Sequence, residues 1–270
     1  MLKKLFYNFY VVLLFFFLYA PIFLLILFSF NNSTSRIVWG GFTLKWYKSL
    51  FHNSEIAKAI INTVVVAVFS ATISTVLSLL ACVGVTNSNR KVYNFVKFLT
   101  NISTVSPEIV IGISFMFFFI TIQKLFTFFN LGLFSLILIH STFCLPYSFL
   151  TILPKFRQIT PQIFEAACDL GATPIKAFFK VIVHEIFPGL VASAMLVFAM
   201  SVDDFIISYF TCGNIQTLSV LIYSMTRKAV TPEINALSSI MFLTILAVLI
   251  INNLKDGKVY KIKNVTQRKQ

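Results

Sequence analysis

Three acidic residues within strongly apolar stretches are the side chains of this sequence best suited to chemistry. They are Glu108, Asp203 and Asp204. A carboxylate near the centre of a membrane helix costs about 2.5–3.5 kcal/mol to insert, so each acid needs either a partner or a function. Ionised carboxylates attract amines and metal ions, and the aromatic rings of Phe205 and Tyr223 can add cation–π contact. These five residues are the candidate path of a cationic substrate.

A structural interpretation of the same acids stands beside the functional one. Asp203 and Asp204 are equally suited to an ion pair or to capping a helix break. Adjacent helical residues point about 100° apart, so the two cannot face one lumen equally. One can contact a ligand while the other hydrogen-bonds a neighbouring helix. Glu108 directly follows Pro107, which suits it to accept amide hydrogen bonds at a broken helix, and we favour this structural role for it.

Other kinds of site are not evident in the sequence. It contains no nucleophilic triad and no phosphate-binding loop. The four cysteines and three histidines are too widely scattered to show a metal-ligand spacing. Three of the cysteines fall in expected membrane or cytoplasmic segments, where disulfides are rare. We therefore expect no catalytic residue, no metal and no cofactor bound by this chain, and a membrane enzyme is disfavoured.

The composition is that of an integral membrane protein. Apolar residues make up 58% of the chain and charged residues 11%, against about 25% charged residues in soluble domains. The net charge of +13 raises the question of nucleic acid. No basic motif with interleaved base-stacking aromatic residues is present, so we expect no nucleic-acid partner.

Six apolar runs predict an all-α membrane protein with six transmembrane helices. The expected spans cover about 9–30, 60–85, 103–122, 131–153, 190–210 and 234–251. The first run is long enough to cross a bilayer and is followed by no small-x-small cleavage site, so we expect an uncleaved anchor. The predicted organisation is an anchor helix with an extracellular loop (1–59), a membrane-spanning core (60–252) and a basic cytoplasmic tail (253–270).

The positive charges predict the orientation of these spans. With both ends on one side, that side receives 15 of the 22 lysines and arginines, and the other side receives 7. Cytoplasmic loops carry the excess of positive charge, so both termini are expected in the cytoplasm of a multi-pass cell-membrane protein. The basic tail is sufficiently explained as a topological anchor, which anionic membrane lipid attracts.

The polar stretch 160–189 predicts a helix, a tight turn and a second helix on the cytoplasmic side. Thr160 and Thr173 each precede a proline, a pattern typical of a helix N-cap. Gly171 supplies the left-handed conformation that ends the first helix, and Pro188 is expected to end the second. A short helix with small residues and one carboxylate suits docking into another protein better than catalysis.

Part of this stretch carries a specific resemblance. The sequence EAACDLGA at 165–172 resembles the EAA loop of permease subunits in bacterial ATP-binding-cassette (ABC) importers. In that family the loop is a coupling helix that enters a cleft on the ATPase. The resemblance implies that Glu165 pairs with a basic residue of the cleft and that Gly171 allows the turn. The implied coupling residues are Glu165, Ala166, Ala167, Asp169 and Gly171.

Further segments are similar to the spermidine/putrescine subfamily of these permeases over nearly the whole chain. They are 39–47, 62–63, 106–114, 140–147, 201–208, 222–225 and 230–238. The resemblance implies a type I ABC importer permease fold and a linear polyamine as substrate. It implies three partners: ATPase subunits that use ATP, a second homologous permease subunit and an extracellular polyamine-binding protein. Within this family Asp204 is the more structural acid, and Asp203 is the better candidate for substrate contact.

The sequence also departs from the family and leaves alternatives open. His184 stands where a proline is usual, so the second coupling helix is expected to continue toward Pro188 without a break. Asn214 and Ser219 replace prolines of the outer loop. The alternatives are a permease for another small organic cation and, from a different class, an ion-coupled cation carrier that relays ions through the three acids. The internal inverted repeat of many such carriers is not evident.

Overall fold

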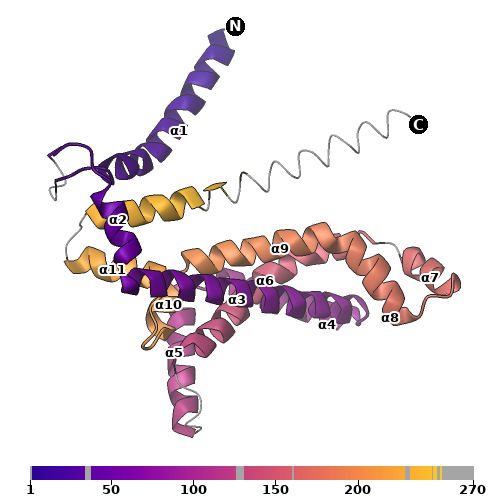
Figure 1. Cartoon of the computed structure of the whole chain (residues 1–270). Coiled ribbons are helices and arrows are strands. Elements are labelled where there is room, and N and C mark those ends of the chain that lie inside the picture. Colours follow the sequence, from indigo (N-terminus) through magenta and orange to yellow (C-terminus); the bar gives the residue numbers. More distant parts are fainter. Residues whose placement is uncertain are drawn as a thin grey trace. The chain divides into compact units, whose positions relative to one another are not determined.

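A computed structural model describes residues 2–33, 38–125, 131–159, 161–228, 232–244, 246–247 and 250. In these residues the regular structure is helical, apart from an isolated antiparallel bridge between Asn31 and Phe42 (Figure 1). The chain divides into two compact units, Lys58–Leu221 and a unit that combines Met1–Ala57 with Ile222–Gln270.

The unit that contains the N-terminus is built on α1 (Leu2–Phe28) and α2 (Lys45–His52). Asn31, just after α1, organises the loop between them. Its side-chain amide donates to the carbonyl of Val38 at 2.9 Å and accepts from the amide of Gly40 at 2.7 Å. Trp46 of α2 donates its indole N–H to the Asn31 carbonyl at 2.8 Å. These bonds anchor α2 to the end of α1.

A ladder of serines joins α3 (Ser54–Thr86) to α6 (Leu133–Arg157) in the second unit. The hydroxyls of Ser70, Ser74 and Ser78 donate to the carbonyls of Ile137, Ser141 and Leu145 at 3.3, 2.8 and 3.1 Å. Each step advances four residues on both helices, so the two run in the same direction. Small hydroxyl-bearing residues allow such close packing between membrane helices.

The same helix, α6, also packs against α9 (Val183–Asp203). The hydroxyls of Ser148 and Ser193 share a buried hydrogen bond of 2.6 Å. An apolar cluster continues this contact toward α10 (Ile206–Thr211). Its buried members are Ala71, Phe119, Ile139, Phe143, Cys144, Val197 and Ile207. The core of the unit is therefore centred on α6.

Among the described residues, four helices are long and apolar enough to cross a membrane, and a bent helix pair adds a candidate fifth span. The four cover Phe9–Phe28, Ser54–Thr86, Leu133–Arg157 and Pro174–Asp203. Helical residues 232–244 cover the start of the predicted sixth span. The end of that span and the basic tail lie outside the described residues. The protein is thus a multi-pass membrane protein with an all-α fold.

The predicted third span is wrong as a continuous helix. It is divided between α4 (Arg90–Val105) and α5 (Glu108–Leu125), which are bent by 103° relative to each other. Pro107 disfavours helical backbone at Ser106, and Ser106 is accordingly extended with ψ 135°.

The predicted fifth span is wrong at both of its ends. The helix continues through Pro188, from α8 (Pro174–Ala177) through a π-helical turn, Phe178–Ile182, into α9. Membrane helices tolerate an internal proline where neighbouring groups satisfy the freed backbone. Gly189 allows close packing rather than a break, since a Cβ there would lie 3.0 Å from Cγ of Lys155. The same helix ends at Asp203, well short of residue 210.

Candidate functional site

The break that follows α9 is built by Asp204. Its backbone is extended (φ −62°, ψ 120°), and its side chain turns toward the start of α10. The carboxylate oxygens accept hydrogen bonds from the amides of Ile207 at 3.3 Å and Ser208 at 2.8 Å. An acid in this position satisfies otherwise unpaired amides and complements the positive end of the helix dipole. Asp204 therefore functions as the N-terminal cap of α10.

A buried histidine of α6 completes this junction. His140 is 1% exposed. Its Nδ1 lies 2.8 Å from the hydroxyl of Ser201 on α9, and its Nε2 lies 3.1 Å from the hydroxyl of Ser208 on α10. The same Nε2 lies 3.5 Å from Oδ2 of Asp204. Ser219, at the start of α11 (Leu218–Lys228), donates to the backbone carbonyl of Asp204 at 2.7 Å.

This set of five residues, His140, Ser201, Asp204, Ser208 and Ser219, is called the polar junction below. It joins four helices through contacts among these side chains and hydrogen bonds to the backbone of Asp204, Ile207 and Ser208. The cost of burying its carboxylate and imidazole is offset by these hydrogen bonds. The arrangement leaves the Asp204 carboxylate committed to the protein itself, so it is poorly placed to bind a substrate.

Asp203 has the opposite environment. It is the last residue of α9 and is exposed, and its carboxylate has no hydrogen bond or ion pair within the described parts of the chain. The backbone break at Asp204 separates the two side chains. An exposed, uncompensated carboxylate beside an apolar helix end is suited to attract an ammonium group.

Glu108 lies at the first position of α5 and is exposed. The amides of Val110 and Ile111 donate to the carbonyl of Pro107, at 3.0 and 3.2 Å, and not to the Glu108 carboxylate. The predicted amide bonds to this side chain are thus absent from the described contacts. Gly112, one turn later, packs against α10, where a Cβ would lie 3.2 Å from the Phe210 ring.

The two predicted aromatic residues are placed in different units. Phe205 directly follows the acid pair, and its ring lies 5.5 Å from that of Tyr209. Tyr223 belongs to the unit that contains α1, where the guanidinium of Arg227 lies 5.9 Å from the centre of its ring. A cation of the protein therefore already occupies one face of Tyr223. Phe205 is next to Asp203 and Asp204 in the sequence, whereas Tyr223 belongs to the other unit.

The predicted coupling residues lie on α7 (Pro161–Asp169) and the turn that follows. Gly171 has φ 88°, as the left-handed helix end requires. Its amide donates to the carbonyl of Cys168 at 2.9 Å, and the amide of Ala172 donates to the carbonyl of Ala167 at 3.1 Å. This pair of hydrogen bonds is a Schellman motif. Thr173 caps α8 by accepting from the amide of Lys176 at 3.5 Å, as predicted. The predicted cap at residue 160 lies outside the described residues.

The surface of this turn combines acidic and apolar side chains. Glu165, Ala166 and Asp169 are exposed. So are Leu170 at 89%, Ile175 at 72% and Phe179 at 64%. Figure 1 shows α7 and α8 at one end of their unit and α10 toward the other. The candidate coupling residues and the acid pair are thus far apart, and α9 runs from one to the other.

Comparison with known proteins decides the family. A family model described as "binding-protein-dependent transport system inner membrane component" matches residues 74–257. The chain belongs to this family. The resemblance to importer permeases drawn from the sequence is therefore confirmed.

Several curated relatives of the permease carry polyamine names. It is 33% identical to the spermidine/putrescine transport system permease protein PotC of Haemophilus influenzae, over 93% of this chain and 96% of the relative. It is 35% identical to PotC of Escherichia coli K12, over 88% and 89% of the two chains. It is 34% identical to the putrescine transport system permease protein PotI of that strain, over 83% and 81%.

The fold of the permease is also found in solved structures. A bacterial ABC transporter involved in import of the acidic polysaccharide alginate matches with a TM-score of 0.68 and 16% identity, over 94% of both chains. The alginate transporter in complex with a pentasaccharide-bound periplasmic protein matches with a TM-score of 0.68 and 16% identity, over 92% of this chain and 91% of that chain. The importer permease fold predicted from the sequence is thus confirmed at the level of architecture.

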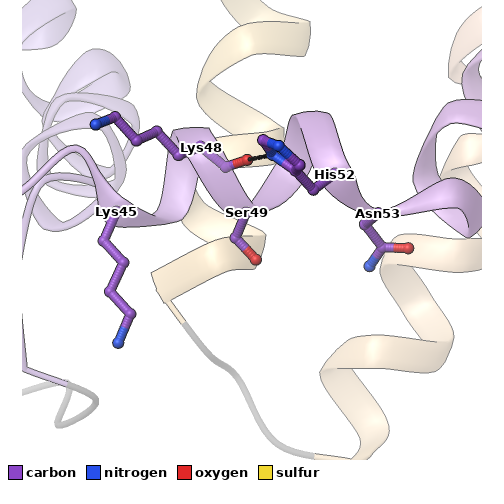
Figure 2. Close-up of a pocket in the computed structure, with 5 residues that line it drawn as sticks. All are labelled: Lys45, Lys48, Ser49, His52 and Asn53. Atoms are coloured by element: carbon purple, nitrogen blue, oxygen red, sulfur yellow. Dashed lines mark hydrogen bonds between the residues drawn. The ribbon is translucent and has the colours of Figure 1, made fainter.

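A cavity on α2 of the permease differs from the acid pair in charge. It has a volume of about 450 Å³ and is lined by Lys45, Lys48, Ser49, His52 and Asn53 (Figure 2). Figure 2 shows His52 held by the carbonyl of Lys48, at 2.8 Å from Nδ1. The two lysines repel a polycation, so this cavity does not fit the predicted substrate.

Two groups of buried polar residues are not predicted from the sequence. The wide spacing of the three histidines does not predict a role for His140, although a titratable side chain in an apolar span needs a polar partner elsewhere. The spacing of Ser70, Ser74 and Ser78, four residues apart, is typical of a hydrogen-bonding face on a membrane helix. Both patterns were present in the sequence.

Proposed function

We propose that this chain is the permease subunit of an ATP-driven importer that carries linear polyamines across the cytoplasmic membrane. The observation that carries the proposal is the contrast between the two adjacent acids. Asp204 is fixed within the polar junction, whereas Asp203 is exposed and has no partner in the described residues. A polyamine offers ammonium groups for Asp203 and methylenes for neighbouring aromatic surface. The PotC and PotI names of the relatives support this substrate class.

The drive for transport comes from a separate ATPase subunit. The α7–α8 turn has the properties of a docking element, because its exposed surface joins two carboxylates, Glu165 and Asp169, to large apolar side chains. Exposed apolar groups of this size are typical of protein contacts. Glu165 would pair with a basic residue of the ATPase cleft. Residues Ala166, Ala167 and Gly171 keep the turn small and tight enough to enter it.

The remaining partners complete the pathway. A second, similar permease subunit forms the other half of the pore, and an extracellular binding protein delivers the polyamine. In this proposal the chain crosses the membrane six times, with both termini and the α7–α8 turn in the cytoplasm. ATP is bound by the partner ATPase and not by this chain. Because α9 runs continuously from the coupling turn to Asp203, rigid-body movement of the turn is transmitted to the acid pair, which supports alternating access.

The substrate assignment is tested by Asp203→Asn in the complete transporter. Removing one charged hydrogen bond to an ammonium is worth about 1.5–3 kcal/mol, so the apparent affinity for spermidine should fall about 10- to 100-fold. The measurement is uptake of labelled spermidine and putrescine into proteoliposomes loaded with ATP.

The matched control is Glu185→Gln, which removes an exposed acid at the other end of α9. Uptake by this variant should stay unchanged. Unaltered uptake kinetics in Asp203→Asn would remove Asp203 from the substrate path. Uptake that follows a proton gradient and ignores ATP depletion would instead identify an ion-coupled carrier.

A further inference from the structure

The last turn of α9 has a buried side and an exposed side. Ser201 and Asp203 lie two positions apart in this turn, so their side chains point about 200° apart around the helix axis. Ser201 is 4% exposed, whereas Asp203 is exposed. The two residues therefore occupy opposite sides of the same turn. A contact that fixes Ser201 also fixes the direction in which Asp203 projects.

The group that contacts Ser201 is the imidazole of His140. Its Nδ1 lies 2.8 Å from the hydroxyl of Ser201 on α9, and its Nε2 lies 3.1 Å from the hydroxyl of Ser208 on α10. A neutral imidazole offers one donor and one acceptor, and a serine hydroxyl can take either role, so both contacts are hydrogen bonds in either tautomer. One rigid ring thus connects the helix before the break to the helix after it.

The ring itself is held in place by α6. His140 is 1% exposed. Its neighbours Ile139, Phe143 and Cys144 belong to the buried cluster that also contains Val197 of α9. Side chains in such a close-packed interior have little room to shift. The imidazole is therefore a fixed reference point for the end of α9.

Neither the helix break nor the packing of α6 on α9 requires this histidine. Asp204 caps α10 through two backbone amides without it. The hydrogen bond between Ser148 and Ser193 already joins α6 to α9, about two turns before the end of α9. A titratable side chain buried in a membrane helix is costly and by default indicates a function. The remaining consequence of His140 is the placement of the last turn of α9.

We propose that His140 is a positioning residue for substrate binding: through Ser201 it sets the direction in which Asp203 presents its carboxylate to an ammonium group. This inference rests on the substrate contact proposed above for Asp203. Helix ends fray where they are not held. A charge-assisted hydrogen bond depends on distance and angle, so a frayed last turn weakens the contact without removing either charge.

The variant Ser201→Ala in the complete transporter tests this role with a small change in volume. The KM for labelled spermidine should rise about 3- to 10-fold, the range expected from one hydrogen bond. The kcat should stay within about twofold, because the weakened contact is one of substrate binding.

The matched control is Ser193→Ala. It removes the hydroxyl of another buried hydrogen bond between α6 and α9, far from the acid. Its KM should stay within about twofold of the original, since it leaves the last turn of α9 in place. Equal rises in the two variants would mean that only helix packing is affected. That result, or an unchanged KM in Ser201→Ala, would overturn the proposal.

The effect of Ser201→Ala should depend on the carboxylate of Asp203. In the Asp203→Asn background, adding Ser201→Ala should change the KM by less than about twofold, because the charge that it would misplace is already gone. A further rise as large as in the original background would show a separate route to the substrate and would exclude the positioning role.

Substitutions of His140 provide a rescue test. His140→Leu removes both hydrogen bonds of the ring. His140→Asn restores a partner for Ser201, because the asparagine amide reaches the position of Nδ1. The KM of His140→Asn should therefore lie closer to the original than that of His140→Leu, and equal values would contradict the role. If His140→Leu does not assemble, the comparison of Ser201→Ala with Ser193→Ala remains decisive.

A measurement without polyamine separates this inference from the proposed function. A nitroxide spin label is attached at position 203 in the variant Asp203→Cys, Cys168→Ser, since the other three cysteines are buried. The signal of Cys168→Ser alone is subtracted. In electron paramagnetic resonance spectra, adding Ser201→Ala should increase the mobility of the label, and adding Ser193→Ala should not.

The outcomes of this measurement are distinct. Unchanged mobility in Ser201→Ala would overturn the positioning role of His140, whatever the uptake results. Increased mobility, together with unaltered uptake kinetics in Asp203→Asn, would retain His140 as the residue that holds the turn and would overturn the substrate contact of Asp203.

Discussion

The polar junction and the α7–α8 turn lie at opposite ends of α9 and satisfy their polar groups in opposite ways. At the junction, a buried imidazole and a buried carboxylate find partners on α6, α9 and α10 of the same chain. At the turn, carboxylates and apolar side chains remain exposed. The first region is complete without another protein, whereas the second presents the surface that we propose docks to the ATPase. Substitutions should therefore act on stability at the junction and on coupling at the turn.

The largest expected effect is that of Asp204→Ala. This change removes two amide caps and leaves His140 without its acidic neighbour, so it should destabilise the protein by about 3–5 kcal/mol. Thermal unfolding of the purified complex, together with its yield, measures the loss. Asp203→Ala is the matched control and should change stability by less than about 0.5 kcal/mol. Similar losses in the two variants would contradict the distinction between the acids.

A double-mutant cycle sharpens this prediction. His140→Ala and Asp204→Ala, alone and combined, should show a coupling free energy of about 1 kcal/mol or more, as expected for residues of one network. Additive losses would mean that His140 acts only through Ser201 and Ser208.

Glu165→Lys should act on coupling and leave stability nearly unchanged. Glu165 is exposed, so its replacement should alter the free energy of unfolding by less than about 0.5 kcal/mol. A lysine facing a basic cleft adds like-charge repulsion, and substrate-stimulated ATP hydrolysis should fall at least tenfold. The charge reversal Glu185→Lys on α9 is the control. Survival of both ATPase co-purification and stimulated hydrolysis in Glu165→Lys would exclude the docking role.

Gly171→Ala should have a smaller effect on the same turn. The φ of 88° at this position costs an alanine about 1–2 kcal/mol. Part of the population should lose the Schellman motif, and substrate-stimulated hydrolysis should fall a few-fold. Gly171→Asn is the comparison variant, because asparagine tolerates this backbone better. An equal loss for alanine and asparagine would show that the side chain, rather than the backbone, is excluded from the interface.

The smallest expected effect is that of Ser74→Ala. It removes one rung of the serine ladder, and buried hydrogen bonds between membrane helices average about 0.6 kcal/mol. Chemical denaturation of the complex measures the change. Ser114→Ala on α5 is the control, because its hydroxyl bonds within its own helix. A loss for Ser74→Ala no larger than the control would show that the ladder sets helix spacing without adding stability.

The sequence predicted the features that depend on local chemistry. The cap at Thr173 and the left-handed Gly171 follow from the conformational preferences of a few adjacent residues, and both are present. The long apolar runs predicted membrane helices because their length matches a bilayer. The family resemblance depended on ordered motifs and is confirmed.

The predictions that were wrong concern features that depend on contacts between distant segments. Pro188 does not end a helix, and Gly189 next to it packs against Lys155 of α6, 34 positions away in the sequence. The end of α9 at Asp203 is set by the capping of α10 and by His140, 64 positions before Asp204. Local preference alone could not predict either, because the partner that decides the outcome lies on another helix.

The serine ladder has a mechanical consequence for a transporter that must change shape. Its three rungs are spaced one helical turn apart on both helices. A continuous slide of α3 along α6 would break all three hydrogen bonds together, and the hydroxyls meet carbonyls in the same pattern again only after four residues, about 6 Å. The favourable registers of α3 against α6 are therefore separated by about one helical turn. During transport, α3 and α6 therefore either move as one body or change register in a single discrete step.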